Sequence, residues 1–276
     1  MPSLREKHHN RFEFVHRFGG WSVLALFWMH AGSTYLDSLD HTLASFPFSG
    51  AFWLLYLLTM SIASPWLRLR RVKVKVERPS SHAVILRFKK GEKPFAGSST
   101  ALSLSPLMEW HSFANIPTPD KKGFRIIVSR AGDWTGRLID DPPRHIWMKG
   151  ITTAGVANVE VLFKRVVYVA TGSGIGPVLP HLLRSKVPIH LIWATRSPEK
   201  TYGMDLVNEI LDSTPDACIW DTDTQGKPDL ANMALSAVAK FNAEAVIVIS
   251  NRKLTETVIR AVELKGVPAY GAIWDS

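Results

Sequence analysis

Two long apolar stretches near the start of the chain contain no Asp, Glu, Lys or Arg. They cover residues 18–36 and 46–67. Since a membrane-spanning helix needs about 20 mostly apolar residues, each stretch is predicted to form a transmembrane helix. The connection between them lacks Lys and Arg, whereas both outer flanks are basic, and this asymmetry places both ends in the cytosol. We therefore expect residues 1–69 to form a hairpin in the lipid bilayer.

Short β-branched segments follow the hairpin, separated by Pro, Gly, Ser and Asp clusters. VKVKV at 72–76 alternates strictly, and three further segments have the same character: AVILRF at 83–88, FRIIVSR at 124–130 and ANVEVLF at 157–163. Short strands between turn signals are typical of compact antiparallel structure. Residues 70–164 are therefore predicted to form a small β-barrel.

From residue 165 onward, apolar strands alternate with helical segments. The strands VVYVA, VPIHLIWAT, ACIWD and AVIVIS are interspersed with helix-like MDLVNEILDS, LANMALSAVAKF and KLTETVIRAVELKG. Strands joined by helices indicate a parallel sheet wound by helices. The expected fold class is thus a transmembrane helix hairpin, then a small antiparallel β-barrel, then an α/β parallel-sheet nucleotide-binding domain over 165–276.

Composition and charge narrow the candidate chemistry. The single cysteine, Cys218, excludes an intrachain disulfide and a thiolate metal site, which favours a reducing compartment. A net charge of +9 suits nucleic acid, anionic lipid or phosphorylated cofactors alike. Basic residues gather at the flanks of the apolar stretches, and no nucleic-acid motif is present, so a membrane is expected and nucleic acid is not. His145, His181 and His190 lack metal-ligand spacing and are expected to be surface or core residues.

The segment TGSGIGP at 171–177 connects a buried strand to a helix that is predicted to begin at Pro177, because proline is favoured at the first helical position. Glycines let the backbone approach a ligand, and free N–H groups at a helix start face a pyrophosphate. The alternative is a plain structural loop. The residues expected to bind a nicotinamide nucleotide here are Gly172, Ser173, Gly174, Ile175, Gly176 and Pro177.

This turn resembles that of the ferredoxin reductase superfamily, whose nucleotide domains carry such a glycine and proline turn. The resemblance implies NADPH or NADH as a cofactor. The stretch ATRSPEKTYG then places Arg196 and Lys200 where that superfamily often contacts the 2′-phosphate of NADP. Solvated surface charges are the alternative interpretation of both residues.

The upstream stretch LSLSPLMEWHSFANI resembles the EWHPFT element of NADPH oxidases and ferric reductases, which implies FAD as a cofactor. The aromatic residue of that element stacks on the flavin, and Phe113 takes its place here, flanked by Trp110, His111 and Ser112. Ser112 replaces the family's proline. Ala114 replaces a Ser or Thr whose hydroxyl bonds flavin N5, which removes a contact that tunes hydride transfer.

Two further elements of these families have partial counterparts. KGITTAG at 149–155 stands where the family has a loop for the FAD pyrophosphate. Its candidate ligands are Lys149, Gly150, Thr152 and Thr153, and an ordinary barrel connection is the alternative. The family's CGP element is replaced by ISN at 249–251. Trp274 corresponds to the C-terminal aromatic residue that covers the flavin until nicotinamide displaces it.

The longest resemblance is to fungal integral membrane flavoproteins of the TmpA type. It is carried by HNRFEFVHRFGGW, EWHSFANIPTP, SRAGDWTG and YGAIWDS. It implies a membrane-anchored oxidoreductase that passes electrons from NAD(P)H through FAD to an unidentified acceptor or partner enzyme. An inactive pseudo-reductase with a regulatory or scaffold role is the alternative, which Ala114 and the missing CGP element favour.

Haem is the remaining cofactor to consider, because His16 and His30 are fourteen residues apart and nearly on one helix face. Ferric reductases space haem ligands in this way. Bis-histidine ligation also needs matching histidines on a second helix, and the stretch at 46–67 contains none. Haem is therefore not expected in a single chain.

Overall fold

The computed structural model describes residues 9–37, 42–89, 94–117, 123–184 and 186–273. The chain divides into two compact units, and some strands contribute residues to both. The first unit contains Met1–Arg71, Leu102–His111 and Trp147–Ile151, and the second contains Val72–Ala101, Ser112–Ile146 and Thr152–Ser276. The boundaries expected from the sequence, after residues 69 and 164, stay predictions.

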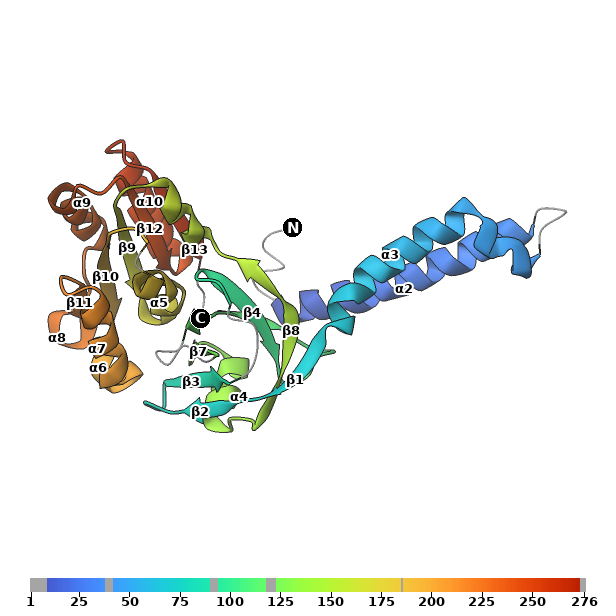
Figure 1. The fold of residues 1–276 in the computed structure, drawn as a ribbon, viewed down its shortest axis with the longest axis horizontal. Coiled ribbons are helices and arrows are strands. Elements are labelled where there is room, and N and C mark those ends of the chain that lie inside the picture. Colours follow the sequence, from blue (N-terminus) through green and yellow to red (C-terminus); the bar gives the residue numbers. More distant parts are fainter. Residues whose placement is uncertain (1–8, 38–41, 90–93, 118–122, 185, 274–276) are drawn as a thin grey trace. The chain divides into compact units, whose positions relative to one another are not determined.

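Two long helices lie side by side in the first unit, joined through a short 3₁₀ helix (Figure 1). They are α2 (His9–Leu36) and α3 (Gly50–Leu67), with η1 (Leu43–Phe48) between them. Trp28 donates from Nε1 to Thr59 Oγ1 at 2.9 Å, and the rings of Trp21 and Trp66 meet edge to face. These aromatic contacts join the two helices.

The helices differ in their bounds from the predicted stretches. α2 begins nine residues before the expected start and includes Arg11 and Arg17, because charged residues continue a helix as readily as apolar ones. α3 begins after Ser49, whose side chain accepts the N–H of Phe52. Of the described helices, only α3 is long and apolar enough to cross a membrane, judged by its length and composition.

Two four-stranded sheets follow, with the strand orders β1-β8-β4-β5 and β2-β3-β7-β6. Their strands are β1 (Leu69–Lys73), β2 (Lys75–Glu77), β3 (Ala83–Phe88), β4 (Ser98–Ser103), β5 (His111–Ala114), β6 (Ile116–Pro117), β7 (Phe124–Ser129) and β8 (His145–Ala154). The second sheet is antiparallel, with Ala83 opposite Ser129 and Phe88 opposite Phe124. The predicted strand at 72–76 is split at Val74, whose N–H bonds Arg144 O.

The predicted strand at 157–163 is wrong, because this segment forms the 3₁₀ helix η2 (Val156–Leu162). Ala157 and Glu160 are its buried residues. They are three positions apart, which is the repeat of a 3₁₀ helix and places both on one face. The period-two pattern of valines misleads here, because Val161 faces solvent.

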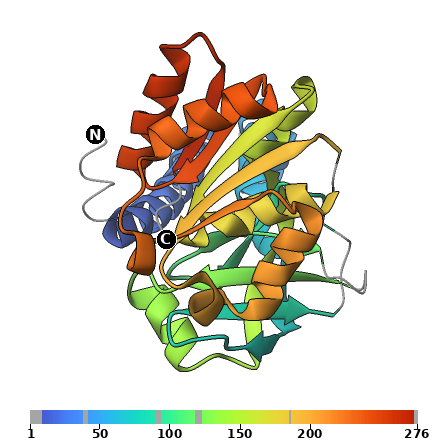
Figure 2. The same cartoon turned by 90° about the vertical axis from the view of Figure 1, so that its left-hand side faces the viewer.

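The α/β part has the predicted parallel sheet, in the order β11-β10-β9-β12-β13. Helices cover both faces (Figure 2). The helices α5 and α7 pack on one face of β9 with Val166 and Tyr168, whereas α9 and α10 pack on the other with Val167 and Val169. The strands are β9 (Val166–Thr171), β10 (Ile189–Thr195), β11 (Cys218–Asp221), β12 (Ala245–Ser250) and β13 (Ala269–Ile273). Because β9 is buried on both faces, its sequence is continuously apolar.

Helix α4 (Asp133–Asp140) follows strand β7 in the antiparallel region. The helices of the α/β part include the four that the sequence predicts, α5, α7, α9 and α10. The full set is α5 (Ile175–Arg184), α6 (Pro198–Tyr202), α7 (Met204–Ser213), α8 (Thr222–Gln225), α9 (Leu230–Phe241) and α10 (Arg252–Glu263). The expected start at Pro177 is wrong: α5 begins at Ile175, directly after the 3₁₀ turn η3 (Gly172–Gly174). Pro177 fits because backbone N–H groups in the first turn have no intrahelical acceptor.

Candidate functional site

The glycine turn lies where the strand order of the parallel sheet reverses. β9 is followed by β10 on one side, and β12 lies on its other side, so the carboxyl ends of β9 and β12 border the crevice where such sheets bind ligands. The last residues of these strands meet there, since Thr171 Oγ1 and Ser250 Oγ are 2.6 Å apart. A bonded pair of hydroxyl groups therefore lies beside the turn, with Thr171 partly exposed and Ser250 buried.

The three glycines of this turn differ in how strongly the surrounding structure requires glycine at their positions. Gly172 adopts a φ of +50°, and its carbonyl accepts from Trp193 Nε1 at 2.9 Å. A Cβ atom on Gly174 would collide with the carbonyl oxygen of Ile249 at the end of β12. A Cβ atom on Gly176 would meet nothing within 4 Å. The turn is thus held against the two central strands. Gly176, in the first turn of α5, has space around it for a Cβ atom.

The end of β10 mixes cations with carboxylates. Arg196 and Lys200 are both exposed, in agreement with either interpretation of these residues. Between them Ser197 has a φ of 35°, donates from its N–H to Asp221 and donates from Oγ to Asp223 at 2.9 Å. Backbone N–H groups of Asp223 and Ser197 lower the pKa of Asp221, so this carboxyl is ionised at neutral pH. A bound nucleotide would meet charges of both signs here.

Strand β5 carries the residues expected to contact flavin. His111 is half-buried and Ser112 is exposed, whereas Phe113 and Ala114 are buried. The ring of Phe113 stacks on Trp134 with centroids 5.7 Å apart and an interplanar angle of 24°. Phe113 therefore packs in the core of the second unit, and its stacking on a flavin stays a prediction.

Trp110 precedes this strand in the first unit and is held on two sides. Its Nε1 donates to Pro106 O at 2.8 Å, and the ammonium group of Lys149 lies 4.8 Å from the centre of its ring. This is the geometry of a cation–π contact. The structure thus brings together two of the predicted cofactor-binding residues, Trp110 and Lys149.

The stretch from Lys149 to Ala154 is part of strand β8 and not a loop. Successive side chains of a strand point to opposite faces, so Lys149 and Thr153 share one face, and Gly150 and Thr152 the other. Thr153 bonds Ser99 at 2.7 Å. The structure therefore does not gather these four predicted residues around one anion. Trp274 lies outside the described residues.

A buried polar cluster next to the glycine turn was not singled out by sequence reasoning. On α5, Nδ1 of His181 lies 2.7 Å from Oε1 of Glu160, and both side chains are almost fully buried. Tyr168 donates from its hydroxyl to the other carboxylate oxygen at 2.9 Å. Burial, followed by the charge of Glu160, raises the pKa of Tyr168, which keeps this hydroxyl protonated as a donor. The cluster joins η2, β9 and α5.

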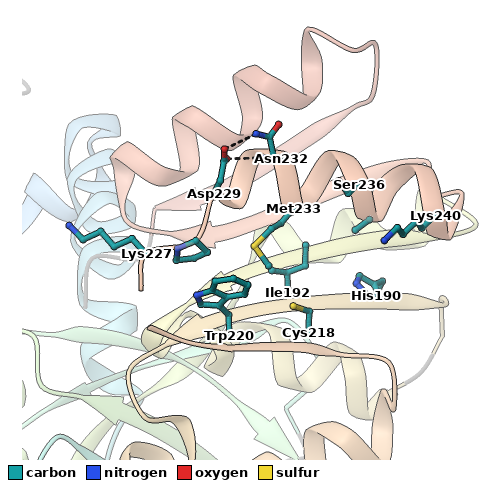
Figure 3. A pocket seen from close by; sticks show the side chains of 12 residues that line it. His190, Ile192, Cys218, Trp220, Lys227, Asp229, Asn232, Met233, Ser236 and Lys240 are labelled. Carbon is teal, nitrogen blue, oxygen red and sulfur yellow. Dashed lines mark hydrogen bonds between the residues drawn. The ribbon is translucent and has the colours of Figure 1, made fainter. Parts of the chain in front are cut away.

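A groove of about 560 Å³ lies between β10, β11 and α9 (Figure 3). Ile192, Met233 and Trp220 line it with apolar surface, and Asp229 at its edge caps α9 by accepting from Asn232. None of the predicted cofactor-binding residues lines this groove. Among the described residues, no group of three His, Cys, Asp or Glu side chains is placed to hold a metal ion.

Comparison with known sequences identifies related proteins. A family model described as the C-terminal domain of adenylate-forming reductase 03009 matches residues 156–276. Adenylate-forming reductases 06235 and 03009 of Coprinopsis cinerea are each 46% identical to the chain over 281 residues. The match covers 100% of this chain and 27% of each relative. The chain thus spans about a quarter of the length of these relatives.

Solved structures define the fold class. Full-length CYP116B46 from Tepidiphilus thermophilus matches 74% of the chain with a TM-score of 0.61 and 18% identity, over 28% of its own length. A ferredoxin NADP+ reductase from Neisseria gonorrhoeae, with bound FAD and NADP, matches 74% of the chain and 98% of its own, with a TM-score of 0.59 and 13% identity. Phthalate dioxygenase reductase matches 74% of the chain and 68% of its own length, with a TM-score of 0.58 and 17% identity. The part beyond the helical hairpin therefore has the ferredoxin-reductase-like fold.

Proposed function

We propose that this chain is a membrane-anchored oxidoreductase module that takes electrons from NADPH or NADH, through FAD, to an acceptor molecule or partner enzyme. The observation that carries the proposal is the glycine turn at the reversal of strand order, pressed against β12 and flanked by Thr171 and Ser250. A ferredoxin-reductase-like neighbour that holds FAD and NADP supports the choice of cofactors.

The nucleotide-binding residues fit a pyrophosphate. Gly174 cannot carry a side chain, because a Cβ atom would collide with Ile249 O, so the backbone of the turn packs directly on the end of β12. The N–H of Gly176 lies in the first turn of α5, where the helix dipole favours an anion. Thr171, which is the more exposed of the two bonded hydroxyl residues, would contact the ligand, and Ser250 would hold it in place from the buried side.

The flavin-binding residues fit in part. Lys149, held over Trp110 within the first unit, suits a phosphate-bearing cofactor. When bound, a flavin would accept a hydride from the nicotinamide and release electrons to the acceptor. Phe113 and Ala114 are less suited to flavin binding, since Phe113 is packed on Trp134 and Ala114 has no hydroxyl.

Those two residues support the second candidate function, an inactive pseudo-reductase that binds nucleotide for a regulatory or scaffold role. Ala114 is buried on β5 and has only a methyl group to offer at the position where the resemblance implies a contact with flavin N5. This candidate shares the nucleotide site with the enzyme and differs only in turnover.

The membrane anchor is also part of the proposal. α3 has no buried residue in the structure, and both helices expose large apolar side chains, such as Leu26, Leu54 and Leu57. Basic residues flank the hairpin on both outer sides. A bilayer would cover this apolar surface and leave both termini and the reductase part in the cytosol.

The visible spectrum tests turnover directly. We expect the full chain, purified in mild detergent, to be yellow or to become yellow with added FAD, and its absorption to bleach when NADPH is added without oxygen. A protein that binds NADPH and FAD but never bleaches would support the pseudo-reductase. A preparation that stays colourless after FAD is added would exclude the flavoenzyme, and the same spectrum would report haem.

Nucleotide preference is expected to depend on Arg196. The Arg196→Ala variant should bind NADPH about tenfold more weakly, because a charge-assisted hydrogen bond to the 2′-phosphate contributes about 1.5 kcal/mol. NADH binding should change less, since NADH has no 2′-phosphate. Titration of both nucleotides measures the ratio, with Arg260→Ala on the far helix α10 as the control. An equal loss for both nucleotides would place Arg196 away from the 2′ position.

A further inference from the structure

A tight turn in the first unit lies between strand β4 and Trp110, the residue that directly precedes strand β5. It spans Ser105–Met108, with Met108 N–H donating to Ser105 O at 2.9 Å and Pro106 in the second position, where proline is favoured. The side chains of Leu107 and Met108 project outward and are 53% and 51% exposed. Two adjacent apolar residues therefore form the tip of this turn.

The backbone carbonyl groups of the turn are hydrogen-bonded within the protein. The carbonyl of Ser105 accepts from Met108 N–H, and that of Pro106 accepts from Trp110 Nε1. Arg17 of α2 donates from Nη1 to the carbonyls of Leu107 and Met108, at 2.7 and 2.8 Å. All four carbonyls thus have donors. This matters because an unpaired backbone polar group in lipid costs several kcal/mol, and that cost keeps most turns out of a bilayer.

The contacts of Arg17 place the turn at one level of the hairpin. The guanidinium group lies 5.8 Å from the ring centre of Trp66, in the last turn of α3, and Trp66 meets Trp21 of α2 edge to face. Tryptophan pairs near the end of a spanning helix are typical of the membrane–water interface. The apolar tip is therefore joined to the interfacial end of the hairpin.

The charges around this end match an anionic surface. α3 ends at Leu67, and the next residues include the exposed Arg68, Arg70 and Arg71. Cations that follow a spanning helix attract anionic headgroups, and each contributes at short range. Exposed leucine and methionine beside such cations match the composition of segments that lie in the interface.

We propose that the Ser105–Met108 turn is a second membrane contact, in which Leu107 and Met108 enter the interface of an anionic bilayer next to the hairpin. This inference rests on the proposed membrane anchor. Its consequence is that Trp110, which is bonded to the turn through Pro106 O, is held close to the bilayer surface. The flavin-binding strand would then begin at the membrane, within reach of an acceptor that is dissolved in lipid.

Site-specific fluorescence tests this contact. In a Cys218→Ser background, single cysteines at Leu107, Leu57 or Leu264 are labelled with a polarity-sensitive dye, and the full chain is placed in nanodiscs that contain phosphatidylserine and spin-labelled lipid. Leu57 on α3 reports the anchor, and Leu264, which is 76% exposed beyond α10, is the aqueous control. We expect a blue shift and a loss of fluorescence at positions 107 and 57, and neither at 264.

The outcomes separate the two proposals. Quenching at 57 without quenching at 107 would overturn the second contact and leave the anchor standing, whereas no quenching at either position would overturn both. A blue shift at 107 without quenching by lipid would indicate a protein contact and also overturn the inference.

Adding Arg17→Gln is expected to reduce quenching at 107 and leave it unchanged at 57, because the hydrogen bonds that hold the turn to α2 are lost. Unchanged quenching at 107 would show that Arg17 does not position the turn.

Discussion

Replacing Gly174 with valine is expected to abolish nicotinamide-nucleotide binding, with the Kd for NADPH raised by about 100-fold or more. A Cβ atom at this position collides with the carbonyl oxygen of Ile249, and valine adds two further methyl groups. The turn must therefore move away from β12, which displaces the N–H groups at the start of α5 from the crevice. Calorimetric titration with NADPH measures the loss.

Gly132→Ala, at the N-cap of α4 and outside the glycine turn, is the matched control for this variant. Its new methyl group meets nothing within 4 Å, so binding should stay close to that of the parent protein. Thermal unfolding and membrane extraction of Gly174→Val check that the domain is folded and the hairpin inserted, and Gly174→Ala serves if valine prevents folding. Unchanged NADPH affinity in a folded Gly174 variant would refute this placement of the site.

Removing the carboxylate of Glu160 is expected to give the second large effect, a loss of about 3 kcal/mol in the free energy of unfolding for Glu160→Ala. His181 Nδ1 would lose its neighbour at 2.7 Å, and Tyr168 would lose one of its two acceptors, all in the buried interior. Because the cluster joins η2 to α5, nucleotide binding should weaken as well. Chemical denaturation measures the stability.

Two controls separate the buried cluster from a general effect of lost charge. Glu160→Gln keeps an acceptor for the Tyr168 hydroxyl and should cost less than the alanine variant. Glu263→Ala, in the exposed last turn of α10, should change stability by no more than about 0.5 kcal/mol. Equal losses for Glu160→Ala and Glu263→Ala would show that the cluster does not stabilise the fold.

The α/β part was predictable because its signals are local. β9 and β12 are continuous apolar runs with all or nearly all residues buried, and such runs identify central parallel strands by themselves. The glycine turn was predictable for the same reason, since a strand, a turn and a helix are contiguous. The start of α5 was misplaced by two residues because the 3₁₀ turn η3 has no signal distinct from the helix that follows it.

The errors in the barrel region come from segments with mixed signals. Residues 157–163 alternate like a strand, but burial of Glu160 against Tyr168 selects a 3₁₀ helix. The resemblance to the family implied a loop from Lys149 to Ala154, yet Gly150 N–H bonds Arg68 O and the segment continues β8. Contacts with residues outside each segment decided both cases.

By itself the sequence determined the helical hairpin, the parallel sheet and the position of the glycine turn, because each depends on residues close together in the chain. Only the tertiary structure decided which distant groups meet. It placed Ser250 against Thr171, Phe113 on Trp134, His181 beside Glu160 and the turn at Leu107 against Arg17. These contacts follow from strand order and helix packing, which depend on the whole chain and which no local pattern of residues encodes.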